Sequence, residues 1–142
     1  MNFSSQYTII DDVASLRDFR TYLATQNIVA VDTEFHAENR YVPQLMLMQI
    51  AMENGDVFLV DPIKVNPEPL GAAMRNLTII THSGKEDVRL MYHALGLRPA
   101  KLFDVQIAAG MLGMHYPTGL QKIVRQHLDR HISKSRRISK LA

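Results

Sequence analysis

Two acidic residues follow a short apolar run in the first third of the chain. Asp32 and Glu34 come directly after Ile28-Val29-Ala30-Val31, a run rich in β-branched residues and too short for a helix. If the extended conformation continues to Glu34, both side chains share one face, about 7 Å apart. Such carboxylates repel each other, and Mg²⁺ or Mn²⁺ relieves that repulsion through oxygen ligands. The pair predicts a metal site for phosphoryl chemistry. Acids that cap the next segment, after a strand ending at Asp32, fit the pattern as well.

A third acid strengthens the metal interpretation. Asp87 lies in the first turn of a predicted helix that follows an apolar strand over 77–81. The helix macrodipole alone favours an acid at this position, so the position does not by itself establish a function. If the two apolar strands are neighbours, their carboxyl ends meet at one sheet edge, where Asp87 would approach Asp32 and Glu34.

The elements that must position these acids follow from hydrophobic periodicity and turn residues. In chain order they are an edge strand over 7–10, a helix from Asp12 to about Thr25, strands over 45–52 and 57–60 around an Asn-Gly turn, a short helix over 67–75, the strand over 77–81, a helix ended by Gly96, a helix capped by Asp104, and a last helix opened by a capping box over 118–121. This order predicts an α/β fold with a mixed sheet, an antiparallel hairpin followed by βα units, flanked by helices.

Composition limits the alternatives. The chain has 142 residues, of which 46% are hydrophobic, enough for one folded domain with a substantial core. It has no cysteine, so disulfides and thiolate chemistry are excluded, and a metal must be held by Asp, Glu or His. No apolar run approaches the roughly 20 residues of a membrane span, and the N-terminus lacks a secretory pattern. We therefore expect a cytoplasmic protein that makes no membrane contact.

The formal net charge of +2 conceals an asymmetry along the chain. Residues 1–121 carry 9 Lys and Arg against 13 Asp and Glu, whereas residues 122–142 carry 7 against 1. A basic end predicts electrostatic binding of single-stranded nucleic acid, although a solvated tail fits equally. The cations without acidic neighbours are Lys134, Arg136, Arg137 and Lys140, in a basic tail over about 133–142.

Several segments match an ordered set of motifs. They are Val-Asp-Thr-Glu-Phe at 31–35, Tyr-Val-Pro-Gln-Leu at 41–45, Met-Gln-Ile-Ala at 48–51, His-Ser-Gly-Lys-Glu-Asp-Val at 82–88, Phe-Asp-Val-Gln-Ile-Ala-Ala at 103–109 and Leu-Gln-Lys-Ile-Val at 120–124. From about Ile28 to Arg137 the chain thus resembles ribonuclease D, a 3′-5′ exonuclease family of the DEDD superfamily. The resemblance implies a ribonuclease H-like fold, Mg²⁺ or Mn²⁺ as cofactor, and the 3′ ends of single-stranded RNA as substrate.

The resemblance also implies roles for the three acids. In the family's mechanism one metal activates a water and a second stabilises the leaving 3′ oxygen. Asp32 would then contact both metals, Glu34 would hold the attacking side, and Asp87 would anchor the second metal. These are the catalytic and metal-binding residues that the resemblance implies.

One motif of the family is missing from the sequence. The third motif, a Tyr or His followed four residues later by the fourth metal-binding Asp, has no counterpart, and the last acid is Asp129. We therefore expect a single exonuclease-like domain over 1–142, truncated at its C-terminal side, with impaired activity. The alternative is a non-catalytic remnant of the fold with weak metal or nucleic-acid binding. An aspartyl-phosphate phosphatase using Asp32 is disfavoured, since Asp rather than Glu is usual two residues later.

Other polar residues carry weaker interpretations. Asp104 belongs to one of the matching segments, and we interpret it as the N-cap of the helix that follows. His127 and His131 have the spacing of a helical metal pair, but we interpret them as packed or surface histidines. His82 and Lys85 lie near the predicted site and could meet a phosphate, although a loop position explains both.

Overall fold

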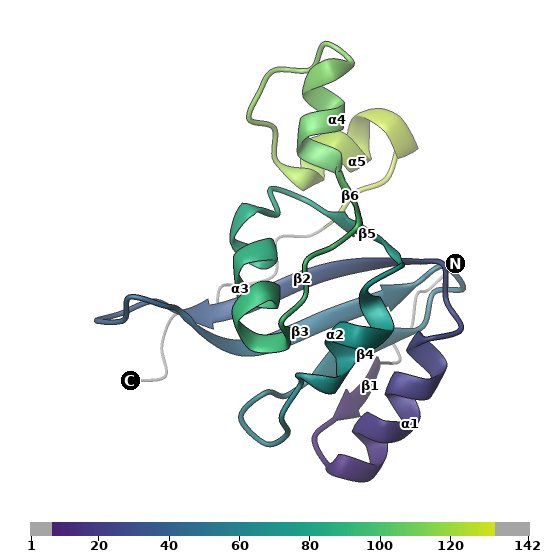
Figure 1. Cartoon of the computed structure of the whole chain (residues 1–142). Coiled ribbons are helices and arrows are strands. Elements are labelled where there is room, and N and C mark those ends of the chain that lie inside the picture. The colour runs from purple at the N-terminus through teal and green to yellow at the C-terminus, as the bar shows by residue number, and fades with distance from the viewer. Residues whose placement is uncertain (1–6, 133–142) are drawn as a thin grey trace. The chain divides into compact units, whose positions relative to one another are not determined.

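The computed structural model describes residues 7–132 and divides the chain into two compact units, one up to Asp104 and one from Val105 onward. The two units are described separately, and Figure 1 shows the elements of each. No helix among residues 7–132 is long and apolar enough to cross a membrane. The basic tail over about 133–142 lies outside the described residues.

The first unit is built on one mixed sheet. Its elements are β1 (Tyr7–Ile10), α1 (Val13–Leu23), β2 (Ile28–His36), β3 (Gln44–Met52), β4 (Val57–Val60), α2 (Pro69–Met74), β5 (Thr78–Thr81), α3 (Lys85–Leu95) and β6 (Lys101–Asp104). The strand order is β1-β4-β3-β2-β5-β6. The β2/β3 and β3/β4 pairs are antiparallel and the other pairs are parallel. The predicted antiparallel hairpin followed by βα units is confirmed, and β6 is a strand that the sequence patterns did not reveal.

Local signals set the boundaries of these elements. Asp12 is the N-cap of α1 and forms a capping box with Ser15, as its side chain accepts from the Ser15 N–H. The turn between β3 and β4 contains Gly55 at a φ of 95°, a conformation that glycine adopts without strain. Gly96 ends α3 in the left-handed conformation. The predicted starts and stops are therefore confirmed at these places.

The core lies between the three helices and one face of the sheet. Buried side chains of α1, α2 and α3 pack with those of β2, β3, β4 and β5. On β2 this face carries Val29, Val31 and Thr33, which are buried, whereas the alternating residues Asp32 and Glu34 are exposed on the other face. The helices thus cover one side of the sheet in this unit and leave the face of Asp32 and Glu34 accessible.

The second unit holds α4 (Val105–Met111) and α5 (Leu120–Leu128). The predicted capping box at the start of α5 is wrong. Gly119 is the N-cap and offers no side chain, while the Thr118 hydroxyl donates to the His115 carbonyl. Gln121, expected to reach back to the cap, donates instead to the Ile132 carbonyl at 3.1 Å. The Thr118 hydroxyl and the Gln121 amide thus bond to the segments before and after the helix. The four-residue pattern contains no information about these partners.

Candidate active site

The two acids of β2 share one face of the sheet. The β2/β3 register runs without interruption through Glu34, which lies opposite Leu47, and shifts only between Glu34 and Phe35. Because the extended conformation is regular up to this shift, Asp32 and Glu34 project in the same direction, as predicted. Gln49, opposite Asp32 on β3, donates from Nε2 to the Asp32 Oδ2 at 3.3 Å. Gln49 therefore helps to orient the Asp32 carboxylate.

The third acid is joined to the same strand segment. The β2/β5 pairing is parallel, as expected, and ends at the pair Ala30 and Ile80. The Thr33 hydroxyl donates to the Asp87 Oδ1 at 2.5 Å, and both side chains are buried. A short bond to a carboxylate of this kind is among the stronger hydrogen bonds in proteins. It connects the first turn of α3 to the residue between Asp32 and Glu34.

Alternation along β2 separates the three acids more than the sequence suggested. Thr33 and its partner Asp87 lie on the helix-covered side of the strand, whereas Asp32 and Glu34 lie on the other. Accordingly, residues 7–132 contain no group of three His, Cys, Asp or Glu side chains close enough to hold a metal ion. The donor chemistry still suits a hard divalent cation, because all three groups are carboxylates and Asp32 and Glu34 share a face.

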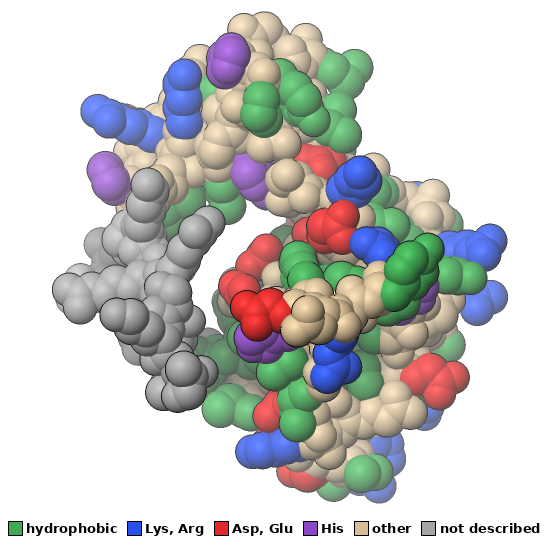
Figure 2. All heavy atoms as spheres, turned by 90° about the vertical axis from the view of Figure 1, so that its left-hand side faces the viewer, with side chains coloured by type: hydrophobic (Ala, Val, Ile, Leu, Met, Phe, Trp, Pro, Cys, Tyr) green, Lys and Arg blue, Asp and Glu red, His purple; other side chains and the backbone are tan. Residues whose placement is uncertain are grey.

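Charge accumulates at the Asp32 carboxylate. Although the residue as a whole is exposed, the surrounding protein desolvates its carboxylate enough to raise its pKa above the ordinary 3.8, and the negative charges of Asp87 and Glu34 raise it further. His82 lowers the pKa of Asp32 in part. Figure 2 shows acidic side chains gathered with histidine on the face where β2 ends. This clustered negative charge is what a bound cation would neutralise.

The raised pKa of Asp32 makes stability depend on pH. Above pH 3.8 the unfolded chain loses this proton more readily than the folded chain, so the free energy of unfolding falls as pH rises through the folded pKa. Asp32→Asn removes this cost. In EDTA, we expect the variant to match the parent well below pH 3.8 and to exceed it in stability at neutral pH, in urea unfolding. Equal stability at neutral pH would contradict this electrostatic account.

Asp104 holds the loop that precedes α3. Its carboxylate accepts from the N–H of Ser83 at 3.1 Å and from the N–H of Gly84 at 2.8 Å. α4 begins directly after Asp104, at the position predicted from an N-cap. However, the two bonds satisfy backbone N–H groups just before α3. The sequence could not reveal this role, because Gly84 and Ser83 lie 20 and 21 residues before Asp104.

Removing the Asp104 carboxylate should loosen this loop. Asp104→Ala leaves two N–H groups without their acceptor, and we expect a loss of about 1–3 kcal/mol in the free energy of unfolding. Because α3 carries Asp87, we also expect weaker Mn²⁺ binding in calorimetry. Asp12→Ala, which removes the N-cap of α1, is the matched control and should leave Mn²⁺ binding unchanged. Equal Mn²⁺ affinities in both variants would show that Asp104 does not position the site.

Two contacts at the site were missed from the sequence. Thr33 and Gln49, which make these contacts, both lie in the matching segments. The contact of Thr33 could have been predicted, because Thr33 is a polar residue at a core-facing position of its strand. His82 was found only as a loop residue near the site. His127 is an exposed surface residue, as predicted, with its Nε2 at 3.3 Å from the Met114 sulfur. His131 is exposed as well.

Comparisons with known proteins identify the family and the fold of this chain. Residues 7–142 match a family model described as 3′-5′ exonuclease. Ribonuclease D of Jannaschia sp. strain CCS1 is 36% identical over 123 residues, which cover 82% of this chain and 32% of that protein. Ribonuclease D of Desulfotalea psychrophila is 32% identical over 133 residues, which cover 92% of this chain and 36% of that protein. The chain thus spans about a third of the length of these relatives.

Solved structures show the same fold. RNase D of Escherichia coli superposes with a TM-score of 0.82 at 28% identity, over 92% of this chain and 35% of that one. The catalytic core of RRP6 from Trypanosoma brucei gives 0.83 at 28% identity, over 99% of this chain and 39% of that one. The sheet order and paired acids described above therefore occur on a ribonuclease H-like exonuclease domain, and the chain belongs to the 3′-5′ exonuclease family.

Proposed function

We propose that the chain is a divalent-metal-dependent exonuclease domain that removes nucleotides from the 3′ end of single-stranded RNA. Asp32, Glu34 and Asp87 are the proposed metal-binding and catalytic residues. The observation that carries this proposal is the 2.5 Å hydrogen bond from Thr33 to Asp87, because it attaches Asp87 to the strand that bears Asp32 and Glu34.

The residues of the chain have distinct parts in this proposal. Asp32 and Glu34 offer oxygen ligands on an accessible face, and Gln49 orients the first of them. Asp87 is buried, so its charge adds to the negative potential at Asp32. Bound Mg²⁺ or Mn²⁺ would supply Lewis-acid activation of the phosphodiester and of the attacking water, in the two-metal arrangement that the family resemblance implies. His82, partly buried nearby, lowers the pKa of Asp32.

The relatives support RNA as the proposed substrate class. The Escherichia coli RNase D structure is described as an exoribonuclease involved in structured RNA processing, and it is 28% identical to this chain. The basic balance of residues 122–142 is consistent with a polyanionic substrate. We therefore propose RNA as the substrate of this domain.

We further propose that the 142 residues alone have low activity. They contain no Tyr or His followed four residues later by Asp beyond Asp87, and general base assistance typically contributes about 10²- to 10⁴-fold. A second candidate function is a non-catalytic remnant that binds metal or nucleic acid weakly. The absence of a three-ligand cluster within residues 7–132 favours this alternative.

A gel assay separates the two functions. Single-stranded RNA labelled at its 5′ end is incubated with excess protein in Mn²⁺, with EDTA and Asp32→Asn as controls. The proposed exonuclease gives a slow ladder that shortens from the 3′ end and disappears in both controls. No shortening after prolonged incubation supports the remnant, while a ladder that survives EDTA or Asp32→Asn rules out the proposed site.

A further inference from the structure

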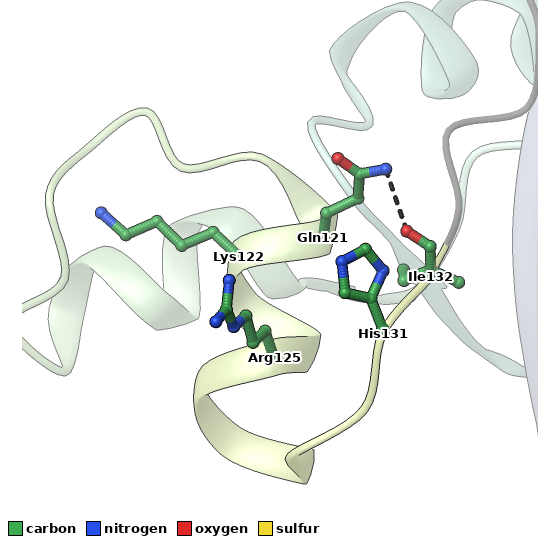
Figure 3. A pocket seen from close by; sticks show the side chains of 5 residues that line it. All are labelled: Gln121, Lys122, Arg125, His131 and Ile132. Carbon is green, nitrogen blue, oxygen red and sulfur yellow. Dashed lines mark hydrogen bonds between the residues drawn. The ribbon is translucent and has the colours of Figure 1, made fainter.

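The second unit has a basic hollow that contains two cations of the basic end of the chain, Lys122 and Arg125. It has a volume of about 250 Å³ and is lined by Gln121, Lys122, Arg125, His131 and Ile132. Figure 3 shows that Lys122 and Arg125 project from α5, whereas His131 and Ile132 belong to the segment that follows the helix. Three of the five lining residues, Lys122, Arg125 and His131, thus have basic side chains, and that of Lys122 extends away from His131 in Figure 3.

The hollow is formed by a reversal of the chain at the end of α5. Asp129 adopts the left-handed conformation at the C-cap, with φ 48° and ψ 38°, and the chain turns back along the helix. The Gln121 Nε2 then donates to the Ile132 carbonyl at 3.1 Å, which fastens the returning segment to the first turn of α5 (Figure 3). This bond therefore holds the segment that carries His131 against α5.

The cations of the hollow are not neutralised by neighbouring acids. Lys122 and Arg125 are exposed, and no ion pair within residues 7–132 joins either to a carboxylate. Asp129 is the one acid in the sequence of the second unit, so this unit has little negative charge of its own to compensate them. A positive concavity of this kind attracts an anion.

We propose that this hollow binds a backbone phosphate of single-stranded RNA. The Arg125 guanidinium can donate two parallel hydrogen bonds to a phosphate, and the Lys122 ammonium adds a point charge beside it. An imidazole N–H of His131 supplies a donor from the opposite wall. The inference rests on the proposed RNA substrate, but it assigns RNA binding to residues outside the acidic site.

The first test measures the affinity of the full chain for a fluorescent 12-nucleotide oligouridylate in EDTA, by anisotropy at several salt concentrations. The pair Lys122→Ala and Arg125→Ala should weaken binding by about tenfold or more at low salt and reduce the salt slope by about 1.4, two contacts at roughly 0.7 each. The matched control removes two exposed cations of the first unit, Arg20→Ala with Arg75→Ala, and should change affinity less than twofold. Equal weakening by both pairs, or by neither, overturns the proposal.

The second test removes no charge. Gln121→Ala frees the returning segment and should weaken oligouridylate binding several-fold, whereas Gln26→Ala, which removes a similar amide-to-carbonyl bond at the end of α1, should not. Unchanged affinity in Gln121→Ala shows that net charge, not the hollow, binds RNA. Inorganic phosphate separates the two sources of the anion. If it shifts the amide resonances of Gln121 and Arg125 while oligouridylate does not, the site takes free phosphate and the RNA assignment is wrong.

These outcomes are independent of the proposed nuclease activity. Because the binding is measured in EDTA, it requires neither a metal nor cleavage. If the RNA gel assay shows no activity while the hollow variants still lose affinity, the exonuclease proposal fails and the phosphate site stands. If cleavage is observed and the variants of the hollow bind RNA normally, the exonuclease proposal stands and the phosphate site is wrong.

Discussion

Asp32→Ala is expected to abolish saturable binding of Mn²⁺ by this chain, with the fold preserved. The charges of both other acids act on the Asp32 carboxylate, since Asp87 and Glu34 each raise its pKa. Loss of a residue that hydrogen-bonds to a metal ligand typically lowers the affinity for the metal by about 10- to 100-fold. Loss of the ligand itself should lower this affinity further. Titration calorimetry with Mn²⁺ on both proteins measures the difference.

The control for this prediction is a second acid-to-alanine change of equal charge. Asp18→Ala removes an exposed carboxylate of α1 that is paired with Arg17, and it should leave the Mn²⁺ affinity unchanged. Circular dichroism should show the same helical content in both variants. If Asp32→Ala binds Mn²⁺ as tightly as the parent, the acids of β2 are not the metal site.

Gly84→Ala is expected to have the largest effect on stability among single methyl additions near the site. A Cβ at Gly84 would lie 2.2 Å from the Thr81 Oγ1 and 2.5 Å from the Thr81 Cβ, and Thr81 is buried. The φ of −79° suits alanine, so the penalty is steric rather than conformational. Overpacking of this kind costs about 1–3 kcal/mol. The loop must move, so we also expect loss of the Asp104 bonds and weaker Mn²⁺ binding.

Gly119→Ala serves as the comparison for the steric argument. Gly119 has a φ of −69°, and no atom lies within 4 Å of the position that an alanine Cβ would take there, so alanine fits without displacement. As the N-cap of α5 it should lose at most about 1 kcal/mol, the usual range for a cap change. Urea unfolding and Mn²⁺ titration on both variants give the comparison. Equal Mn²⁺ affinities of Gly84→Ala and Gly119→Ala would show that the loop before α3 does not position the proposed metal site.

The sheet was largely predictable from the sequence because its strands have strong local signals. The β-branched run before Asp32, the Asn-Gly turn and the left-handed Gly96 each restrict the backbone within a few residues. β6 was missed because Lys101–Asp104 is short and exposed and owes its conformation to pairing with β5. Pairing between distant strands is not encoded in local periodicity.

The pairing of the strands that position the candidate acids was predictable, but the contacts of these acids were not. The motifs predict Asp32, Glu34 and Asp87 as site residues, and the parallel β2/β5 pairing confirms that the two strands are neighbours. Asp87 bonds to Thr33 on one face of β2, whereas Asp32 and Glu34 lie on the other face. This separation depends on which face of the sheet α3 covers. The capping box of α5 failed for a related reason: the Thr118 and Gln121 side chains have other partners, at His115 and Ile132. Side chains with several possible partners are resolved only by tertiary structure.

The most direct test of the proposed metal site is a crystal of this chain soaked in Mn²⁺, with anomalous diffraction used to locate the ion. We predict an anomalous peak within coordination distance, about 2.0–2.6 Å, of carboxylate oxygens of Asp32 and Glu34. A second peak nearer Asp87 would agree with the two-metal arrangement. Density at other acids or histidines with none at Asp32, at an Mn²⁺ concentration that saturates the protein in solution, would contradict the proposed site.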